Sequence, residues 1–82
     1  MSDRTHAPGR EIDLDVRFLD PPEPFERTIE ALDRLAPGDT LNLLIHREPH
    51  PIYQMLRQSG YTYRAEQRDD GMWLIRIRLA AT

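Results

Sequence analysis

The stretch Phe18–Leu35, FLDPPEPFERTIEALDRL, joins two different patterns of apolar residues through a proline-rich turn. Before the turn, apolar and charged residues alternate along Glu11–Phe18, which is typical of a half-buried β-strand. After the turn, apolar side chains recur at the spacing of one helical face, at Phe25, Ile29 and Leu32. The change of period predicts a strand and then a helix near Glu23–Ala36, which Pro37-Gly38 ends.

The remainder of the chain repeats this arrangement and then adds a hairpin. It predicts a more apolar strand at Thr40–His46, a short helix at Pro51–Ser59, and strands at Tyr61–Arg68 and Met72–Leu79 around an Asp-Gly turn. A right-handed crossover makes the first two strands parallel, whereas the hairpin is antiparallel. The order β-α-β-α-β-β therefore predicts an α+β fold, a two-layer α/β sandwich with a four-stranded mixed sheet and both helices on one face. The residues expected to be mostly buried are Leu14, Val16, Ile29, Leu32, Leu43, Ile45, Leu56, Ile75 and Ile77.

Length and composition limit the classes of protein. With 82 residues the chain has room for one domain, predicted at residues 11–82 after a disordered polar tail at residues 1–10. It contains no apolar run of membrane-spanning length, and its net charge of −3 gives no electrostatic reason to bind nucleic acid or a membrane. The absence of cysteine favours a cytoplasmic protein and excludes thiol catalysis.

One edge of the predicted sheet collects the candidate functional residues. Both helices begin where a parallel strand ends, and α/β sheets usually bind ligands at such an edge. Free N–H groups at helix starts favour an anion there. Against this, glutamates at the helix starts already supply negative charge, and no glycine-rich loop is present to bring the backbone close to a phosphate. The candidate residues for binding a ligand or partner are Arg17, Pro22, Glu23, Pro24, His46, Arg47, Glu48 and His50.

Metal binding and catalysis have weaker support in the sequence. His46, Glu48 and His50 have side chains that suit zinc, but Pro49 and Pro51 keep the segment out of a regular helix. They are weak metal candidates. No nucleophile with a base and an orienting group is suggested, so we expect no enzyme and no cofactor. The aromatic residues of the strands alternate onto the inward face, which does not suit RNA binding.

The run from the first strand through Pro22-Glu23-Pro24 resembles the TusA/SirA-like sulfur-carrier family, whose members open their first helix with a Cys-Pro-x-Pro turn. The segments LDVRFLDPPEPFERTIEALDRLAPGDTL and HREPHPIYQML resemble more closely a cysteine-less bacterial branch of unknown function. Members of that branch occur in settings linked to respiratory and nitrogen-oxide metabolism. The likeness extends over Glu11 to Leu79 and implies the fold. Sulfur carriage needs a thiolate, which this chain lacks.

The sequence therefore predicts a non-enzymatic interaction module of the bacterial cytoplasm. It is expected to bind an unidentified protein partner through the Pro22–Pro24 and His46–Pro51 edge, as a monomer or weak homo-oligomer. The alternative is a domain that binds a small ligand, an anion or a metal at the same edge, in the metabolic setting that the resemblance implies.

Overall fold

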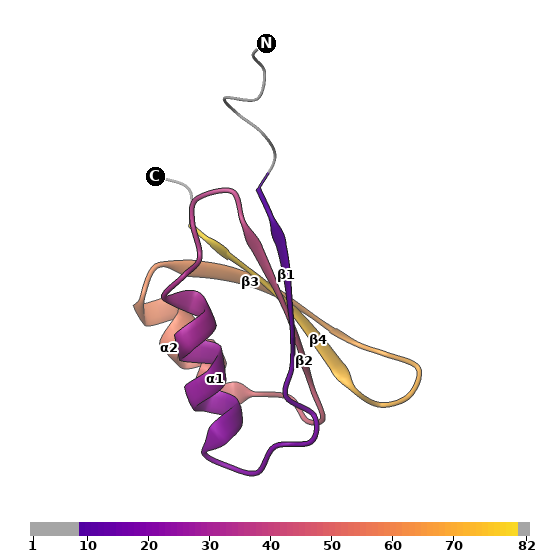
Figure 1. The fold of residues 1–82 in the computed structure, drawn as a ribbon. Coiled ribbons are helices and arrows are strands. Elements are labelled where there is room, and N and C mark those ends of the chain that lie inside the picture. The colour runs from indigo at the N-terminus through magenta and orange to yellow at the C-terminus, as the bar shows by residue number, and fades with distance from the viewer. Residues whose placement is uncertain (1–8, 81–82) are drawn as a thin grey trace.

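The computed structural model describes residues 9–80 as a four-stranded sheet with two helices against one face (Figure 1). The elements are β1 (Glu11–Asp15), α1 (Glu23–Leu32), β2 (Thr40–Ile45), α2 (His50–Gln58), β3 (Tyr61–Gln67) and β4 (Trp73–Leu79). The strand order is β1-β2-β4-β3; β1 runs parallel to β2, and the other neighbours are antiparallel. This confirms the predicted fold and the central position of the second strand.

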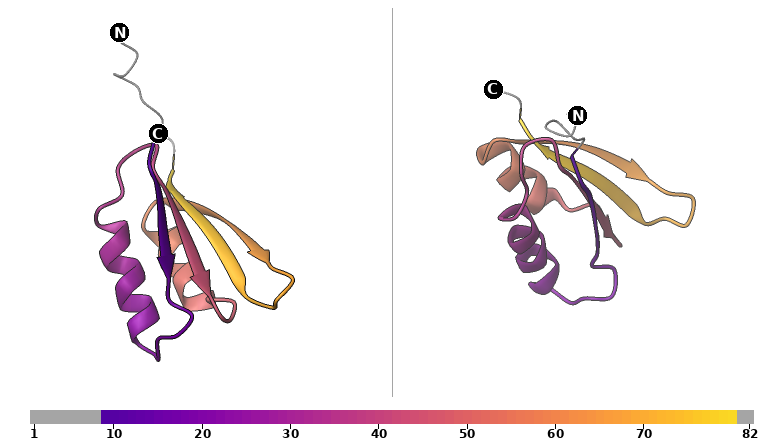
Figure 2. Two further views of the ribbon diagram at one scale, coloured as in Figure 1. Left: turned by 45° about the vertical axis from the view of Figure 1, so that its right-hand side comes forward. Right: turned by 45° about the horizontal axis from the view of Figure 1, so that its top comes forward.

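The strand order explains why both helices share a face. The connections from β1 to β2 and from β2 to β3 step across the sheet in the same direction. Right-handed crossovers that step in the same direction place their helices on the same side. The last strand, β4, then returns into the gap between β2 and β3, and the opposite face of the sheet stays uncovered (Figure 2). Within residues 9–80, neither helix is long and apolar enough to cross a membrane.

The core lies between the sheet and the helices. Its fully buried apolar side chains come from both layers and include Val16, Leu41, Leu43, Leu56, Ile75 and Ile77. Seven of the nine predicted core residues are buried, and the other two, Leu14 and Ile29, are partly buried. Leu14 lies on an edge strand, and Ile29 borders a hollow between the helices and the start of β3.

The prediction that the first strand continues to Phe18 is wrong. Its pairing with β2 ends at Asp15, followed by one further bond from the Val16 N–H to the Leu44 carbonyl (2.9 Å). Because β2 itself ends at Ile45, the chain has no further partner and turns. The Leu19 N–H donates to the Val16 carbonyl (3.2 Å), and this turn leaves Phe18 84% exposed.

The first helix also ends earlier than predicted, at Leu32 instead of Ala36. The Asp33 N–H still bonds four residues back, to Ile29, but the N–H groups of Arg34 and Leu35 bond to carbonyls three residues back, which is a tighter winding than an α-helix. Leu35 nevertheless remains buried, so the apolar periodicity continues beyond the regular helix. The second helix agrees with its prediction to within one residue at each end.

Candidate functional site

Both helices begin with the same Pro-X-Pro pattern. In α1 it is Pro22-Glu23-Pro24 and in α2 it is Pro49-His50-Pro51, with one proline just before the helix and one at its second residue. Neither start has a side-chain cap. Since α1 follows β1 and α2 follows β2, and these strands are parallel, the two starts lie at the same end of the sheet (Figure 1).

The prolines remove most of the hydrogen-bond donors that a helix start usually offers. An ordinary helix leaves its first N–H groups without intrahelical partners, but proline has no N–H to leave. The N–H groups of Glu23 and His50 are occupied by carbonyls in the preceding turns, at 2.9 and 3.1 Å. In the part of the chain that the structure describes, only Phe25 and Ile52 keep a first-turn N–H without a partner. Each helix start therefore retains one free donor.

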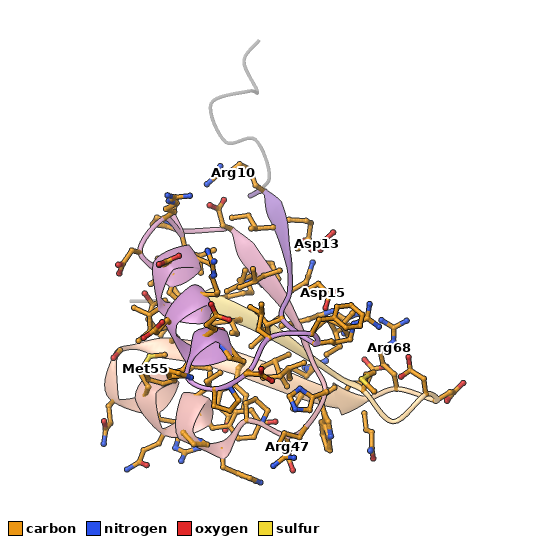
Figure 3. The ribbon with its side chains drawn as sticks, turned by 60° about the horizontal axis from the view of Figure 1, so that its bottom comes forward. Arg10, Asp13, Asp15, Arg47, Met55 and Arg68 are labelled. Carbon is orange, nitrogen blue, oxygen red and sulfur yellow. The ribbon has the colours of Figure 1, made fainter. Side chains whose placement is uncertain are left out.

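A cleft of about 390 Å³ lies between the two helix starts. Its walls are mostly apolar and contain five prolines of the two turns, with Phe25, Ile45 and Ile52. Three polar side chains complete the lining: Asp20, His46 and Arg47. We call this site the Pro-X-Pro cleft. Arg47 lies at the end of the molecule where both helices begin (Figure 3).

His46, which lines the cleft, carries a buried polar atom without a partner in the described part of the chain. It is the residue directly after β2, and its Nδ1 atom is buried without a hydrogen-bond partner among residues 9–80. An unpaired buried polar atom costs roughly 1–3 kcal/mol. His46 is therefore a lining residue whose hydrogen-bonding capacity is not fully used within these residues.

The structure brings four of the predicted site residues together in the cleft: Pro22, Pro24, His46 and Arg47. The other four, which are Arg17, Glu23, Glu48 and His50, do not line it. Arg17 lies in the turn after β1 and binds Asp15 through two bonds, Nε to Oδ1 at 2.9 Å and Nη2 to Oδ2 at 2.8 Å. These bonds lower the pKa of Asp15 and engage Arg17 outside the cleft.

Glu48 and His50 are held by a tyrosine instead. The Tyr53 hydroxyl donates to Glu48 Oε2 (3.1 Å), and His50 Nε2 lies 3.4 Å from Glu48 Oε1. The Tyr53 ring stacks on Tyr63 of β3, with centroids 4.5 Å apart. Burial, together with the Glu48 carboxylate, raises the pKa of Tyr53. These contacts fasten the start of α2 to the sheet. Among the described residues, no three His, Cys, Asp or Glu side chains form a group that could hold a metal ion.

Sequence reasoning missed part of the lining, namely Asp20, Pro21, Phe25, Ile45 and Ile52, and it included Pro49 and Pro51 in the predicted edge without singling them out as site residues. A signal for several of them was present in the sequence. The second Pro-X-Pro repeats the first at the same place relative to its strand, which marks the two turns as a pair. The apolar members carry no such signal, because core and cleft residues look alike in a sequence.

Replacing Tyr53 with phenylalanine tests the Glu48 anchor. The substitution keeps the ring stack and leaves Glu48 without its donor, so we expect a loss of unfolding free energy of about 1–3 kcal/mol in urea titrations. Tyr61→Phe is the matched control, since that hydroxyl makes a longer bond of 3.4 Å to the Leu32 carbonyl and should matter less. Equal losses in the two variants would contradict the anchoring role.

The molecule is thus a small α/β domain with a proline-walled cleft where its two parallel strands end. A family model described as an uncharacterised conserved protein (DUF2249) matches residues 13–79, and the chain belongs to that family. The matched range includes every residue of the Pro-X-Pro cleft. Comparisons with curated proteins and with solved structures each returned no match.

Proposed function

We propose that this protein is a non-enzymatic interaction module that binds an apolar segment of a partner protein in the Pro-X-Pro cleft. The observation that carries the proposal is the pairing of two proline-capped helix starts across a mostly apolar hollow. Such a hollow, with a few polar groups at its wall, suits one or two apolar side chains of a partner. His46 and the charges of Arg47 and Asp20 would then fix the orientation of the bound segment.

The scarcity of donors favours a protein segment over an anion. Anion sites at helix starts depend on several N–H groups directed at the ligand. Here each helix retains one, and Asp20 adds negative charge to the wall. A small ligand or anion is the second candidate, and the unpaired Nδ1 of His46 beside Arg47 is the observation in its favour. A metal has no comparable support within residues 9–80.

The likeness to the TusA/SirA-like superfamily agrees with this proposal. The resemblance rests on the element order and on the Pro-X-Pro opening of the first helix, whereas the carrier thiol is missing from this chain. In our proposal the chain keeps a recognition edge of that superfamily without its sulfur chemistry. A bacterial cytoplasmic setting and a link to respiratory or nitrogen-oxide metabolism belong to the same proposal.

Photo-crosslinking tests the cleft directly. A photoreactive amino acid in place of Arg47, at the cleft, should capture one or a few proteins in an extract of the source cells. The same group in place of Arg27, an exposed residue of α1 outside the cleft, should not capture them. Excess unlabelled wild-type protein should suppress the Arg47 adducts, because both compete for one partner.

A matched pair of competitors makes the test specific. Pro51→Arg places a long cation at an exposed position of the cleft wall, whereas Pro37→Arg makes the same change in the loop after α1. Loss of either proline changes stability by only about 0.4–1 kcal/mol. We expect excess unlabelled Pro37→Arg protein to suppress the Arg47 adducts as the wild type does, and excess Pro51→Arg protein to leave them unchanged. Equal competition would reject the cleft as the binding site.

The second candidate has its own readout. Nitrate, nitrite or phosphate that raises the melting temperature of the wild type, but not of Arg47→Ala, would favour a small-anion site. Elemental analysis of the purified protein tests the metal alternative. If no protein is crosslinked at position 47, a melting-temperature shift of this kind would replace the interaction proposal by a small-anion site, and a bound metal would replace it by a metal site.

A further inference from the structure

The uncovered face of the sheet is divided into an acidic and a basic half. The acidic half is a row of carboxylates on β1, formed by Glu11, Asp13 and Asp15, and Figure 3 shows Asp13 and Asp15 projecting away from the helices. The basic half consists of Arg76 and Arg78 on β4 with Arg64 on β3. The net charge of the chain does not reveal this division, because the division depends on which residues the sheet register places beside one another.

The register aligns the two halves in one row across the four strands. Asp13 pairs with Asn42, Asn42 with Arg76, and Arg76 with Arg64. The Asn42 amide donates to Glu11 Oε1 at 2.9 Å and to Asp13 Oδ1 at 3.0 Å. Asn42 thus separates the carboxylates from the guanidinium groups of the same chain.

Several of these charges have no opposite charge among the residues that the structure describes. Across residues 9–80, neither Glu11 nor Asp13 forms a salt bridge, and neither do Arg64 and Arg78. Arg76 pairs with Glu66 at 3.1 Å. Arg64 stands directly opposite Arg76, and like charges in that position destabilise a sheet. An oppositely charged surface would relieve the repulsion in each half.

We propose that this face binds a second copy of the same chain. A two-fold rotation places the carboxylates of β1 against the partner's basic half, and it makes the same match a second time. A partner with one sign of charge, such as a nucleic acid, would meet repulsion from one half. Leu44 and Leu74, which pair across β2 and β4 and are half-buried, add an apolar contact on this face.

The face also has hollows that side chains of a second copy can fill. Two shallow hollows, of about 410 and 530 Å³, lie on it, and Glu11 and Arg76 line both. The first hollow contains the β1 carboxylates and, at its border, Arg68, and the second contains Arg64 and Arg78. Long side chains of the partner can enter such hollows while keeping their charged ends solvated.

The size of the face predicts a weak dimer. Four strands about 4.8 Å apart, of five to seven residues at about 3.3 Å each, span roughly 20 by 20 Å. Both copies together would bury on the order of 800 Å², less than the roughly 1,600 Å² of a standard stable interface. We expect a dissociation constant on the order of 0.1 mM. The helices and the Pro-X-Pro cleft remain outside the interface, so this inference does not depend on the proposed function.

Sedimentation equilibrium over a wide concentration range measures the association. We expect dimer to form at low salt and to disappear at high salt, because the Debye length falls from about 30 Å at 0.01 M to about 3 Å at 1 M. A wild-type protein that stays monomeric at low salt and millimolar concentration would overturn the proposal.

A charge-swap experiment identifies the surface. The acidic half is reversed by Glu11→Arg with Asp13→Arg, and the basic half by Arg64→Glu with Arg78→Glu. Each variant alone should be monomeric, because like charges then meet twice. An equimolar mixture should form heterodimer at least as well as the wild type, because both contacts regain opposite charges. Circular dichroism establishes that the variants fold; if a double variant does not, Asp13→Lys and Arg78→Glu provide the same comparison.

Simple attraction between oppositely charged proteins is controlled separately. Glu26→Arg with Glu30→Arg changes two exposed residues of α1 and gives the same net charge as the reversed acidic half. Mixed with Arg64→Glu/Arg78→Glu, this control should form no heterodimer, because one of the two contacts would bring carboxylates together, and it should only form the homodimer expected of its unchanged sheet face. Association equal to that of the swapped pair would overturn the proposal. So would binding of a single-stranded oligonucleotide by a monomeric wild type that Arg64→Glu/Arg78→Glu abolishes, because that result would assign the basic half to nucleic acid.

Discussion

Replacing Leu32 with alanine is expected to lower the free energy of unfolding by about 2–5 kcal/mol. Leu32 is the last residue of α1, is 4% exposed and belongs to the core between the helices and the sheet. The substitution loses the transfer energy of the removed atoms and leaves a cavity. A domain of this length has a total stability of roughly 4–12 kcal/mol, so the variant should be close to unfolding.

Urea denaturation followed by circular dichroism measures this loss, and Ile29→Ala provides the comparison. Ile29 lies almost one turn earlier on the same helix and is only half-buried, so its loss should be clearly smaller. Equal losses would mean that the burial difference between these two positions has no energetic consequence. A loss below about 0.5 kcal/mol at Leu32 would mean that the helix face is assigned wrongly.

The fold was predictable because its signals are local. The change of apolar period after Asp20, the proline-rich turns and the Asp-Gly hairpin each act within a few residues. Phe18 shows where local signals end. It continues the alternation of β1, but a strand extends only as far as its partner, and β2 ends at Ile45. The end of a pairing is a tertiary property that alternation alone does not contain.

The candidate site was predictable in position and only partly in composition. Parallel strands bring their carboxyl ends to one edge, which is why Pro22 and His46 were expected near each other and line one cleft. The direction of a side chain depends instead on contacts made elsewhere. Glu48 turns towards Tyr53 and Arg17 turns back to Asp15, and neither contact belongs to a recognisable motif.

Asp39 shows what sequence reasoning did not detect. It lies in the loop between α1 and β2, follows Pro37-Gly38 and resembles an ordinary turn residue. In the structure it is only 4% exposed and accepts hydrogen bonds from two backbone N–H groups, of Ala36 at 3.0 Å and Arg10 at 2.9 Å. It thereby joins the strand β1 to the loop that leads into β2. Arg10, which the sequence assigned to the tail, is held here; residues 1–8 lie outside the described part of the chain.

Stability is expected to fall in acid through this carboxylate. The N–H groups of Ala36 and Arg10, with the Arg10 guanidinium at 3.0 Å, lower the pKa of Asp39 from its ordinary 3.8 to about 2. In the unfolded chain these donors are absent, so the unfolded state takes up the proton at higher pH. The contribution of Asp39 to stability is therefore complete above about pH 4 and decreases as the pH falls towards about 2.

Asp39→Asn isolates that contribution. Asparagine keeps one oxygen acceptor but loses the charge, so the variant should be less stable than wild type at neutral pH and should lose less stability between about pH 4 and about pH 2. Arg10→Ala removes the guanidinium and retains both backbone donors. Because that guanidinium is mostly exposed, with 66% of its side chain accessible, Arg10→Ala should behave more like wild type than like Asp39→Asn. Urea titrations at several pH values measure all three proteins. Parallel pH profiles for wild type and Asp39→Asn would mean that other carboxylates cause the loss of stability in acid. Asp39 would then join β1 to the loop without contributing to the acid response.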